Sequence, residues 1–417
     1  MLETQTGEKL DSSRFRQFPS GIRTEESDKE VELISNRIAG VEGFGYRIRG
    51  DSCDMSEQCS AGDLDHSNMN HVRGSHQGVS IWLISQQECS KISNFATYRN
   101  IDYGIYLQAE SSLLVENCVM FDNPISLLPF VIKPEPIEHE LIQKSVTIRN
   151  SLIGGMSESL DCVRDFATIE NARYFDKTDG LRAPRSDNGG FYGYILTTFM
   201  GSKNRSPIEG WHTVWSKSQI LGKTCLSDNT FAEFSSKCGV SSIAISSNKE
   251  SPDMMHPTIS DRNFMINVAE SNRLLFHRPK LEWVTSEEKA RCVDMDCDAA
   301  KKIMIRDDGS LSGSDFPVSI VAQSDFEWNQ DTRRGLGDYR IPYVMLTNSD
   351  GSKRDVNEYA PNKGIIRDGS CERNDDWIAD VCAGLNHQFG FKMNNFNGHN
   401  INQRWFFVGM SHLTKKS

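Results

Sequence analysis

The sequence feature that most constrains the fold is a short phrase that recurs along the first part of the chain, from Asn36 to Asn150. In each copy an Asn follows a run of alternating apolar residues and precedes a small or apolar residue, as at Asn94, Asn117 and Asn150. Most copies are followed by Gly or Pro and a second short apolar run, as in residues 104–107 and 124–127. Short strands separated by tight turns, at a period of about 20 to 50 residues, are typical of a solenoid.

The spacing of this phrase gives the length of one coil. Earlier copies occur at Asn36 and Asn70, and the successive positions 36, 70, 94, 117 and 150 differ by 34, 24, 23 and 33. A basic coil of about 23 residues with two insertions of about ten fits these differences, and we expect the insertions near residues 50–66 and 132–144. In stacked coils an inward Asn can hydrogen-bond the backbone of its neighbour and tolerate a left-handed turn beside it. We therefore predict an asparagine ladder, with ordinary surface asparagines as the alternative, at Asn36, Asn70, Asn94, Asn117 and Asn150.

We predict an all-β chain built around a right-handed parallel β-helix. The solenoid is expected over residues 31–297, after a polar lead-in at residues 1–30. Beyond residue 297 the pattern changes to strands joined by tight Asp- and Gly-rich turns, which indicates antiparallel hairpins. Residues 298–417 are therefore predicted to form a small β-rich appendage, with one short helix at residues 375–385 capped by Asn374.

Composition and charge exclude several classes of function. Hydrophobic residues make up 37% of the chain, which suits a loop-rich β protein. The net charge of -11, without a long Lys/Arg cluster, argues against a nucleic-acid partner. No apolar run approaches the roughly 18 residues of a membrane span, so we expect no transmembrane segment in this chain. The N-terminus lacks the basic and apolar regions of a signal peptide.

The 11 cysteines suggest an oxidising compartment. Four pairs lie close in sequence and would each close a short loop: Cys53 with Cys59, Cys225 with Cys238, Cys292 with Cys297, and Cys371 with Cys382. The spacing of residues 292 and 297 does not fit a zinc knuckle, and no metal or cofactor is predicted. The sequon at Asn204 would fit a glycosylated loop. Disulfides without a signal peptide suggest an internal piece of a longer secreted or membrane-anchored protein.

Several longer phrases resemble the β-helix region of the fibrocystin and fibrocystin-L family. They are residues 36–46, 100–108, 146–155, 276–279, 292–299, 306–310, 337–342 and 363–368. Their order and rough spacing are kept from about residue 31 to 385, and fibrocystin-L is the nearer match. The resemblance implies a large single-pass membrane protein with a long extracellular part, in which this region follows a G8 domain. A more distant resemblance is to the cell-migration-inducing hyaluronan-binding protein family.

Many parallel β-helices depolymerise polysaccharides, so paired carboxylates on the coils are of interest. Asp102, Asp122 and Asp161 each follow a coil strand and are the candidates, with Tyr103 and Phe121 as aromatic neighbours. The alternative is that each Asp closes a turn by capping backbone N–H groups. No coil carries the aspartates and Gly-His-Gly of a polygalacturonase-type site.

We therefore predict a non-catalytic extracellular segment of a fibrocystin-L-like receptor or coat protein, which binds a protein or glycan ligand or serves as a scaffold. The alternative is a glycan-active β-helix that binds or depolymerises a hyaluronan-type polysaccharide. A fold shared with enzymes does not by itself transfer an activity. The three aspartates and two aromatic residues in one groove would favour the glycan hypothesis, and scattered positions would favour the scaffold.

Overall fold

The computed structural model describes residues 20–24, 31–54, 67–82, 88–133, 141–169, 190–201, 219–247, 257–276, 302–323, 343–347, 358–359, 366–367, 371–383, 388–392 and 406–409. Four residues singled out from the sequence lie outside these ranges: Cys59, Asn204, Cys292 and Cys297. The predicted pairs and the glycosylated loop that involve them stay predictions.

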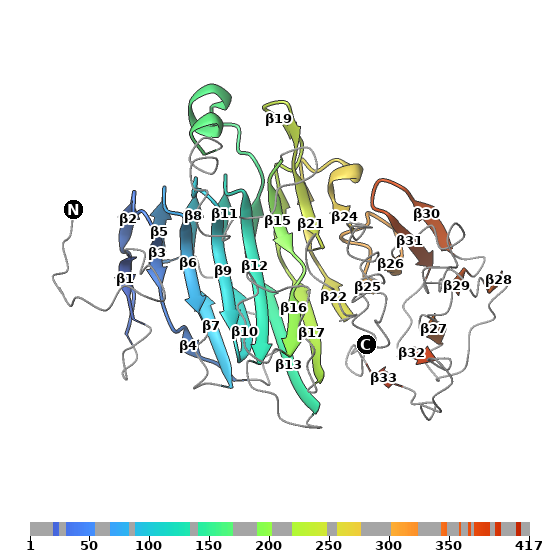
Figure 1. Ribbon diagram of the computed structural model, residues 1–417. Coiled ribbons are helices and arrows are strands. Elements are labelled where there is room, and N and C mark those ends of the chain that lie inside the picture. The colour runs from blue at the N-terminus through green and yellow to red at the C-terminus, as the bar shows by residue number, and fades with distance from the viewer. Residues whose placement is uncertain are drawn as a thin grey trace, which may run out of the picture.

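Three long sheets form the body of the molecule (Figure 1). Sheet A contains β1 (Ser20–Arg23), β3 (Phe44–Arg47), β6 (Gln77–Trp82), β9 (Tyr103–Ala109), β12 (Ile125–Lys133), β15 (Tyr192–Ile195), β16 (Thr198–Gly201), β21 (Ile243–Ser246) and β24 (Leu274–Leu275). Sheet B contains β2 (Arg37–Ala39), β5 (Asn70–Arg73), β8 (Phe95–Tyr98), β11 (Val119–Phe121), β14 (Leu152–Gly154), β18 (Thr230–Ala232) and β23 (Phe264–Ile266). Sheet C contains β4 (Asp51–Ser52), β7 (Cys89–Ser93), β10 (Ser112–Glu116), β13 (Leu141–Arg149), β17 (Gln219–Ser227), β22 (Pro257–Asp261), β25 (Lys302–Asp307), β26 (Val318–Gln323), β31 (Ala379–Ala383) and β30 (Cys371–Asn374).

Each complete coil contributes one strand to sheet C, then one to sheet B, then one to sheet A. The coil made of β7, β8 and β9 is followed by the coil made of β10, β11 and β12. Their parallel registers pair Cys89 with Ser112 and Ala96 with Val119, so in both sheets the partner lies one predicted coil length further along the chain. The chain therefore forms a three-sided parallel β-helix with the predicted coil length. Its right-handed sense stays a prediction.

The parallel stack is longer at both ends than the sequence predicted. β1 pairs in parallel with β3, so the first coil begins inside the expected polar lead-in. β25 pairs in parallel with β22, so the stack continues past residue 297 to Asp307. The predicted insertion at residues 132–144 is narrower, because β12 continues to Lys133 and β13 begins at Leu141.

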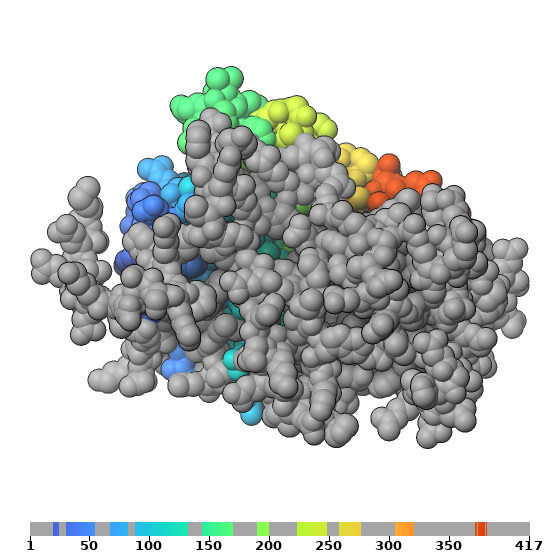
Figure 2. All heavy atoms as spheres, in the orientation of Figure 1, coloured from blue at the N-terminus to red at the C-terminus, as the bar shows by residue number. Residues whose placement is uncertain are grey.

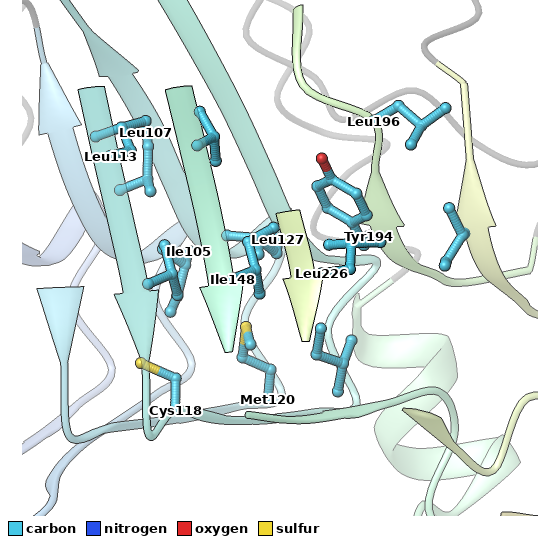
Figure 3. Close-up of a cluster of buried hydrophobic side chains, with 14 of the residues drawn as sticks. Ile105, Leu107, Leu113, Cys118, Met120, Leu127, Ile148, Tyr194, Leu196 and Leu226 are labelled. Carbon is cyan, nitrogen blue, oxygen red and sulfur yellow. The ribbon is translucent and has the colours of Figure 1, made fainter. Parts of the chain in front are cut away.

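The interior of the β-helix is filled by apolar side chains stacked in columns (Figure 3). In sheet A, Ile105 lies beside Leu127 in register, and in sheet C Val115 lies beside Ile148. All four are fully buried, because every second strand residue points inward. Cys118 lies in the same core as a free thiol, and burial raises the pKa of this thiol to about 12.

A hairpin closes the C-terminal end of the stack where the sequence predicted a helix at residues 375–385. β30 and β31 pair antiparallel across a turn at residues 375–378. Asn374 does cap this turn, since its Oδ1 accepts a hydrogen bond from the Trp377 backbone N at 3.1 Å. Ile378 has a φ of 57°, outside the helical region, and the helix cannot continue. The prediction of a helix was wrong because the capping residue Asn374 begins a tight turn, and the residues after this turn form the strand β31.

Trp377, at the tip of this hairpin, covers the last coil. Its side chain is fully buried, and its indole Nε1 donates to the carbonyl oxygen of Glu270 at 2.8 Å. The Phe276 backbone N donates to the Trp377 carbonyl oxygen at 3.0 Å. Solenoids need a cap over the terminal coil because its apolar interior would otherwise meet water. The hairpin provides that cap.

The remaining elements are small. They are the pair β19 (Ser236–Lys237) and β20 (Val240–Ser241), the sheet β27 (Tyr343–Thr347), β32 (Gln388–Lys392) and β33 (Phe406–Gly409), the pair β28 (Glu358–Tyr359) and β29 (Ile366–Arg367), and the short helices η2 (Cys162–Phe166) and η3 (Glu270–Asn272). Within the described ranges, no helix has the length and apolar character needed to cross a membrane.

Candidate functional site: the polar corner around Arg99

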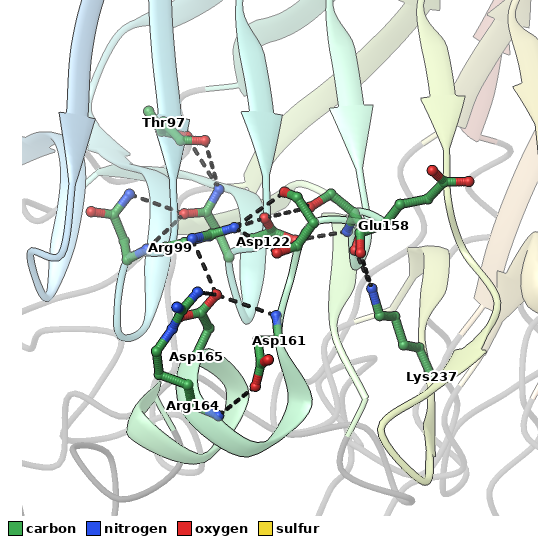
Figure 4. Close-up of polar contacts among 12 residues, drawn as sticks. Thr97, Arg99, Asp122, Glu158, Asp161, Arg164, Asp165 and Lys237 are labelled. Carbon is green, nitrogen blue, oxygen red and sulfur yellow. Dashed lines mark hydrogen bonds and ion pairs between the residues drawn. The ribbon is translucent and has the colours of Figure 1, made fainter.

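Polar side chains gather where sheet B turns into sheet A. β8 ends at Tyr98 and β11 ends at Phe121. The residues that follow, Arg99 and Asp122, both have a left-handed backbone with φ of 52° and 56°. Coil stacking places these two positions on adjacent rungs, beside the segment that follows β14. We call this group the Arg99 corner (Figure 4), and it consists of Arg99, Asp122, Ser157, Ser159, Asp161 and Asp165.

Asp122 is the buried anchor of the Arg99 corner. One carboxylate oxygen accepts a hydrogen bond from the Ser157 backbone N at 2.7 Å, and the other accepts one from Ser157 Oγ at 2.7 Å. Arg99 Nε lies 3.5 Å from the second oxygen. An Asp tolerates the left-handed turn, and its carboxylate fixes the loop of the next coil. Asp122 therefore ties three consecutive coils together.

Arg99 extends this connection outward. Its Nη2 donates to the Ser159 carbonyl oxygen at 3.0 Å and to Ser159 Oγ at 3.1 Å. Its Nη1 lies 3.1 Å from Asp165 Oδ2. The planar guanidinium thus contacts Asp122 on one side and η2 on the other, a geometry that a Lys could not reproduce.

Asp161 and Asp165 shape η2 itself. Asp161 is the N-cap, and its Oδ1 accepts hydrogen bonds from the backbone N of Val163 at 2.9 Å and of Arg164 at 2.7 Å. The Asp165 carboxylate accepts hydrogen bonds from Arg164 Nε at 2.7 Å and from the Asp161 backbone N at 3.2 Å. The hydrogen bond from Arg164 is the main reason that the pKa of Asp165 is lowered to about 2. Both carboxylates therefore serve as turn and helix caps.

η2 and the β19–β20 hairpin form one projection that is locked by a disulfide. Cys162 in η2 bonds to Cys238 in the hairpin turn. Lys237 Nζ donates to the carbonyl oxygens of Ser157 and Glu158. In the space-filling view the two segments lie side by side at the upper edge of the molecule (Figure 2). The contacts of the Arg99 corner connect this projection to the coils.

The other two candidates, Asp102 and Tyr103, lie apart from these contacts. Asp102 is buried in the turn before β9, where its Oδ2 lies 3.4 Å from His76 Nδ1. Tyr103 packs on Tyr106, with ring centroids 5.0 Å apart, in an apolar cluster that also contains Ile125 and Tyr192. The structure therefore joins Asp122 and Asp161 through the Arg99 corner, and it places Tyr103 in a separate packed cluster.

The arrangement is one of turn capping. Asp122 and Asp161 use their oxygens for backbone N–H and hydroxyl donors of the chain itself. Glycoside hydrolysis instead needs two carboxylates that face a sugar across about 5 to 10 Å. Phe121 lies on the outer side of sheet B over Gly154, so it does not share a surface with Tyr103. Of the three aspartates and two aromatic residues, Asp122 and Asp161 belong to one group of contacts, and Asp102, Tyr103 and Phe121 lie outside it.

No group of three or more His, Cys, Asp or Glu side chains that could hold a metal ion is found in the part of the chain that the structure describes.

The cysteine pairs differ from the predicted nearest-neighbour pairs. Cys53 bonds to Cys89, which lies 36 residues away and in the next rung of sheet C, and not to Cys59. Cys238 bonds to Cys162 and not to Cys225, which is itself disulfide-bonded. The prediction was wrong because coil stacking brings residues one turn apart into contact, whereas sequence proximity ignores the stack. For Cys371 and Cys382 the pairing stays a prediction, and β30 and β31 place the two residues opposite each other.

The five ladder asparagines occupy two neighbouring columns. Asn94, Asn117 and Asn150 are corner residues with φ of 61°, 53° and 49°. Asn36 and Asn70 stand one position later, at the start of sheet B, and Asn36 Nδ2 donates to Asn70 Oδ1 at 3.0 Å. The stacked hydrogen bonds therefore belong to the position after the corner Asn.

Further along the stack this second column uses other residues. The Ser151 backbone N donates to Asn229 Oδ1 at 3.1 Å, and the Asn229 backbone N donates to Asn263 Oδ1 at 3.1 Å. A separate ladder lies at the Arg99 corner, where Asn100 Nδ2 donates to Asn123 Oδ1 at 2.9 Å. Each ladder satisfies backbone N–H groups at a turn, where no sheet partner is in register.

Sequence reasoning missed Arg99, Ser157 and Asp165. A usable signal existed, because Arg99 precedes Asp122 by one coil length, and Asn100 precedes Asn123 by the same interval. An alignment of successive coils at this spacing would have placed Arg99 beside Asp122. Ser157 and Asp165 carry no such signal, since they lie in a loop that departs from the repeat.

Comparison with known proteins finds fibrocystin-L and fibrocystin as relatives of this chain. Fibrocystin-L of Mus musculus is 33% identical over 357 residues, which cover 85% of this chain and 8% of that protein. Fibrocystin-L of Homo sapiens gives the same identity and coverage. The chain is a relative of fibrocystin-L. Fibrocystin of Canis lupus familiaris is 30% identical over 312 residues, or 74% of this chain and 7% of that protein. No protein-family model matches the sequence.

The chain spans only about 8% of the length of the fibrocystin-L proteins that it matches. The relationship therefore concerns one region, and the activities and partners of the whole relatives do not follow from it. The more distant resemblance to the cell-migration-inducing hyaluronan-binding family stays a prediction.

Proposed function

We propose that this chain is a non-catalytic, extracellular β-helix segment of a fibrocystin-L-like cell-surface protein, which acts as a rigid scaffold and presents a binding surface. The observation that carries the proposal is the Arg99 corner. Asp122 bonds to Ser157 of the next coil, Asp165 pairs with Arg99 of an earlier coil, and Asp161 caps η2, so these carboxylates hold the projection in place.

An extracellular location is supported by the disulfides. Cys53–Cys89 joins β4 to β7, and Cys162–Cys238 joins η2 to the β19–β20 hairpin. Structural disulfides between stacked coils persist in oxidising compartments and are rare in the cytosol. The relationship to fibrocystin-L supports the same location.

A rigid projection suits a binding role. Val163 at the tip of η2 is 87% exposed, and the Arg164 side chain is 73% exposed. A single exposed apolar side chain is normal on a protein surface, so the binding role is argued from the rigidity of the projection. The disulfide and the Arg99 corner hold this tip in one conformation, which reduces the entropy lost on binding.

The scaffold proposal is tested by measuring polysaccharide cleavage directly. The chain, secreted from cultured cells, is incubated with hyaluronan of defined length, and the length distribution is followed by light scattering after size-exclusion chromatography. The expected result is an unchanged length distribution with the wild-type chain.

The matched variants are Asp102→Ala, Asp122→Ala and Asp161→Ala, with heat-unfolded protein as the blank. Shortening of hyaluronan by the folded wild type, abolished by Asp102→Ala or Asp161→Ala, would overturn the proposal in favour of a glycan-active β-helix. Asp161 is the most informative position, because its side chain is exposed and its replacement leaves the core intact.

A further inference from the structure

The disulfide between Cys162 and Cys238 lies in a different environment from the other disulfide sulfurs that the structure describes. Cys162 and Cys238 are both half-buried, so water reaches both residues. Cys89, which is bonded to Cys53, is only 3% exposed, and the bonded Cys225 is 2% exposed. Thiol–disulfide exchange needs access to one sulfur and a stable thiolate on the other. Of the two bonds with both cysteines in the described ranges, only Cys162–Cys238 meets this condition at both ends.

Burial protects the Cys53–Cys89 bond against attack at either sulfur. A thiolate cannot approach Cys89 from solvent, because this side chain is buried on β7. An attack on Cys53, which is half-buried, would leave the negative charge on Cys89. A buried thiolate is unfavourable because it loses its hydration. The bond between β4 and β7 is therefore expected to resist reduction while the chain is folded.

The charges beside Cys162 and Cys238 favour one direction of opening. Lys237 precedes Cys238 in the β19–β20 hairpin, and its ammonium donates to two carbonyl oxygens of the segment that leads into η2. A thiolate on Cys238 would therefore have a positive charge as its neighbour in the chain, which stabilises it. Cys162 instead follows the exposed carboxylate of Asp161, which repels a thiolate. We therefore expect attack on Cys162, with Cys238 as the leaving group.

The conformation of η2 depends strongly on this disulfide. η2 has five residues, none of them buried, so the burial of apolar side chains contributes little to its stability. A helix of this length is not stable by itself in water. Besides the disulfide, η2 is held by the Asp161 cap, by the contact of Asp165 with Arg99, and by Phe166, whose ring centroid lies 5.7 Å from that of Phe191. The disulfide is its covalent link to the hairpin.

We propose that Cys162–Cys238 is a redox-sensitive switch, which a dithiol reductant opens while Cys53–Cys89 stays closed, and that its opening releases η2 from the hairpin. The first thiolate of the reductant bonds to Cys162 Sγ, the Cys162–Cys238 bond breaks, and its electron pair leaves on Cys238 Sγ, which takes a proton from water. The second thiolate of the reductant then bonds to the first sulfur and displaces Cys162, which is protonated in turn. The reductant ends as a disulfide, and the chain has gained two electrons and two protons.

Opening the bond changes the state of the projection. With the disulfide closed, the tip of η2 at Val163 is fixed relative to the hairpin. With the disulfide open, the tip samples more conformations, and a partner that binds it must order it again at a cost in entropy. Reduction therefore weakens binding at this tip. This last consequence rests on the proposed binding role of the projection, whereas the selective opening of the bond does not.

Partial reduction of the folded full chain tests the selectivity. The chain is incubated with the dithiol dithiothreitol, samples are alkylated at intervals, and the cysteine peptides are quantified by mass spectrometry. Cys162–Cys238 is expected to open at least about ten-fold faster than Cys53–Cys89 in the folded chain, and within about three-fold of it in guanidinium, where burial no longer protects Cys89. Lys237→Gln is expected to slow the opening about three-fold, and the matched control Lys237→Arg, which keeps the charge, to leave it unchanged.

Hydrogen exchange tests the release of η2. The amides of Asp165 and Phe166, which donate to the Asp161 carbonyl oxygen, are expected to exchange about ten-fold faster after selective reduction, and the Leu152 amide in sheet B to stay unchanged. Cys162→Ser/Cys238→Ser should show the same increase, with no further change on adding the reductant. Equal or faster opening of Cys53–Cys89, or exchange in η2 that reduction leaves unchanged, would overturn the proposal. Cleavage of hyaluronan would overturn the scaffold role and affect neither readout.

Discussion

Asp122→Ala is the substitution whose effect the structure specifies most closely. The change removes two acceptors, both 2.7 Å from donors of Ser157, and loses the contact with Arg99. Leaving a partly buried backbone N–H without its acceptor costs about 2 kcal/mol. An Ala at a φ of 56° adds about 1 kcal/mol, because it lacks the local hydrogen bonds by which Asp tolerates this conformation. The expected local destabilisation is therefore the sum of these two effects, about 3 kcal/mol.

Hydrogen exchange at the Ser157 amide measures this local free energy directly. A loss of about 3 kcal/mol corresponds to exchange that is roughly 100-fold faster in Asp122→Ala than in wild type. Asp122→Asn keeps the turn and one acceptor oxygen and should lose about 1 kcal/mol. Asp161→Asn, at an exposed cap, should leave the Ser157 amide unchanged. Equal protection of Ser157 in Asp122→Ala and wild type would refute the role assigned to the Arg99 corner.

The cap, the disulfide and the ion pair give three further predictions. Trp377→Ala should lower the free energy of unfolding of the last coil by about 3 to 5 kcal/mol, which would be measured as a lower urea midpoint. A loss below about 0.5 kcal/mol, as for an ordinary surface substitution, would show that Trp377 does not cap the stack. Cys162→Ser with Cys238→Ser should speed exchange in η2 without changing the core, and an altered core would contradict a local role. The pKa of Asp165 is lowered to about 2 by the hydrogen bond from Arg164, so its stabilisation is present above about pH 4 and lost as the pH falls towards 2. An NMR titration midpoint at the usual value of an Asp would contradict this.

The coil repeat was readable from the sequence because it is imposed by local chemistry. Each corner needs a left-handed residue, and Asn94, Asn117 and Asn150 supply it at spacings of 23 and 33 residues, the larger of which contains an insertion. The alternation of apolar residues then assigns the strands. Coil length and the all-β class followed from these two signals alone.

The cross-coil contacts were not readable in the same way. The bond between Cys162 and Cys238 spans 76 residues, and Asp122 meets Ser157 across 35. Both depend on loops that interrupt the repeat, so no fixed spacing predicts them. The hairpin around Trp377 was also missed. An Asn that accepts a hydrogen bond from a backbone N–H three residues later, as Asn374 does, can begin either a helix or a tight turn, and the sequence does not distinguish the two.

The disulfide map of the secreted chain tests the stacked-coil account most directly. Non-reducing proteolysis followed by mass spectrometry identifies which cysteine peptides remain joined. The account predicts peptides joined through Cys53 and Cys89, and through Cys162 and Cys238. Peptides joined through Cys53 and Cys59, or through Cys225 and Cys238, or cysteines that are all reduced, would contradict it.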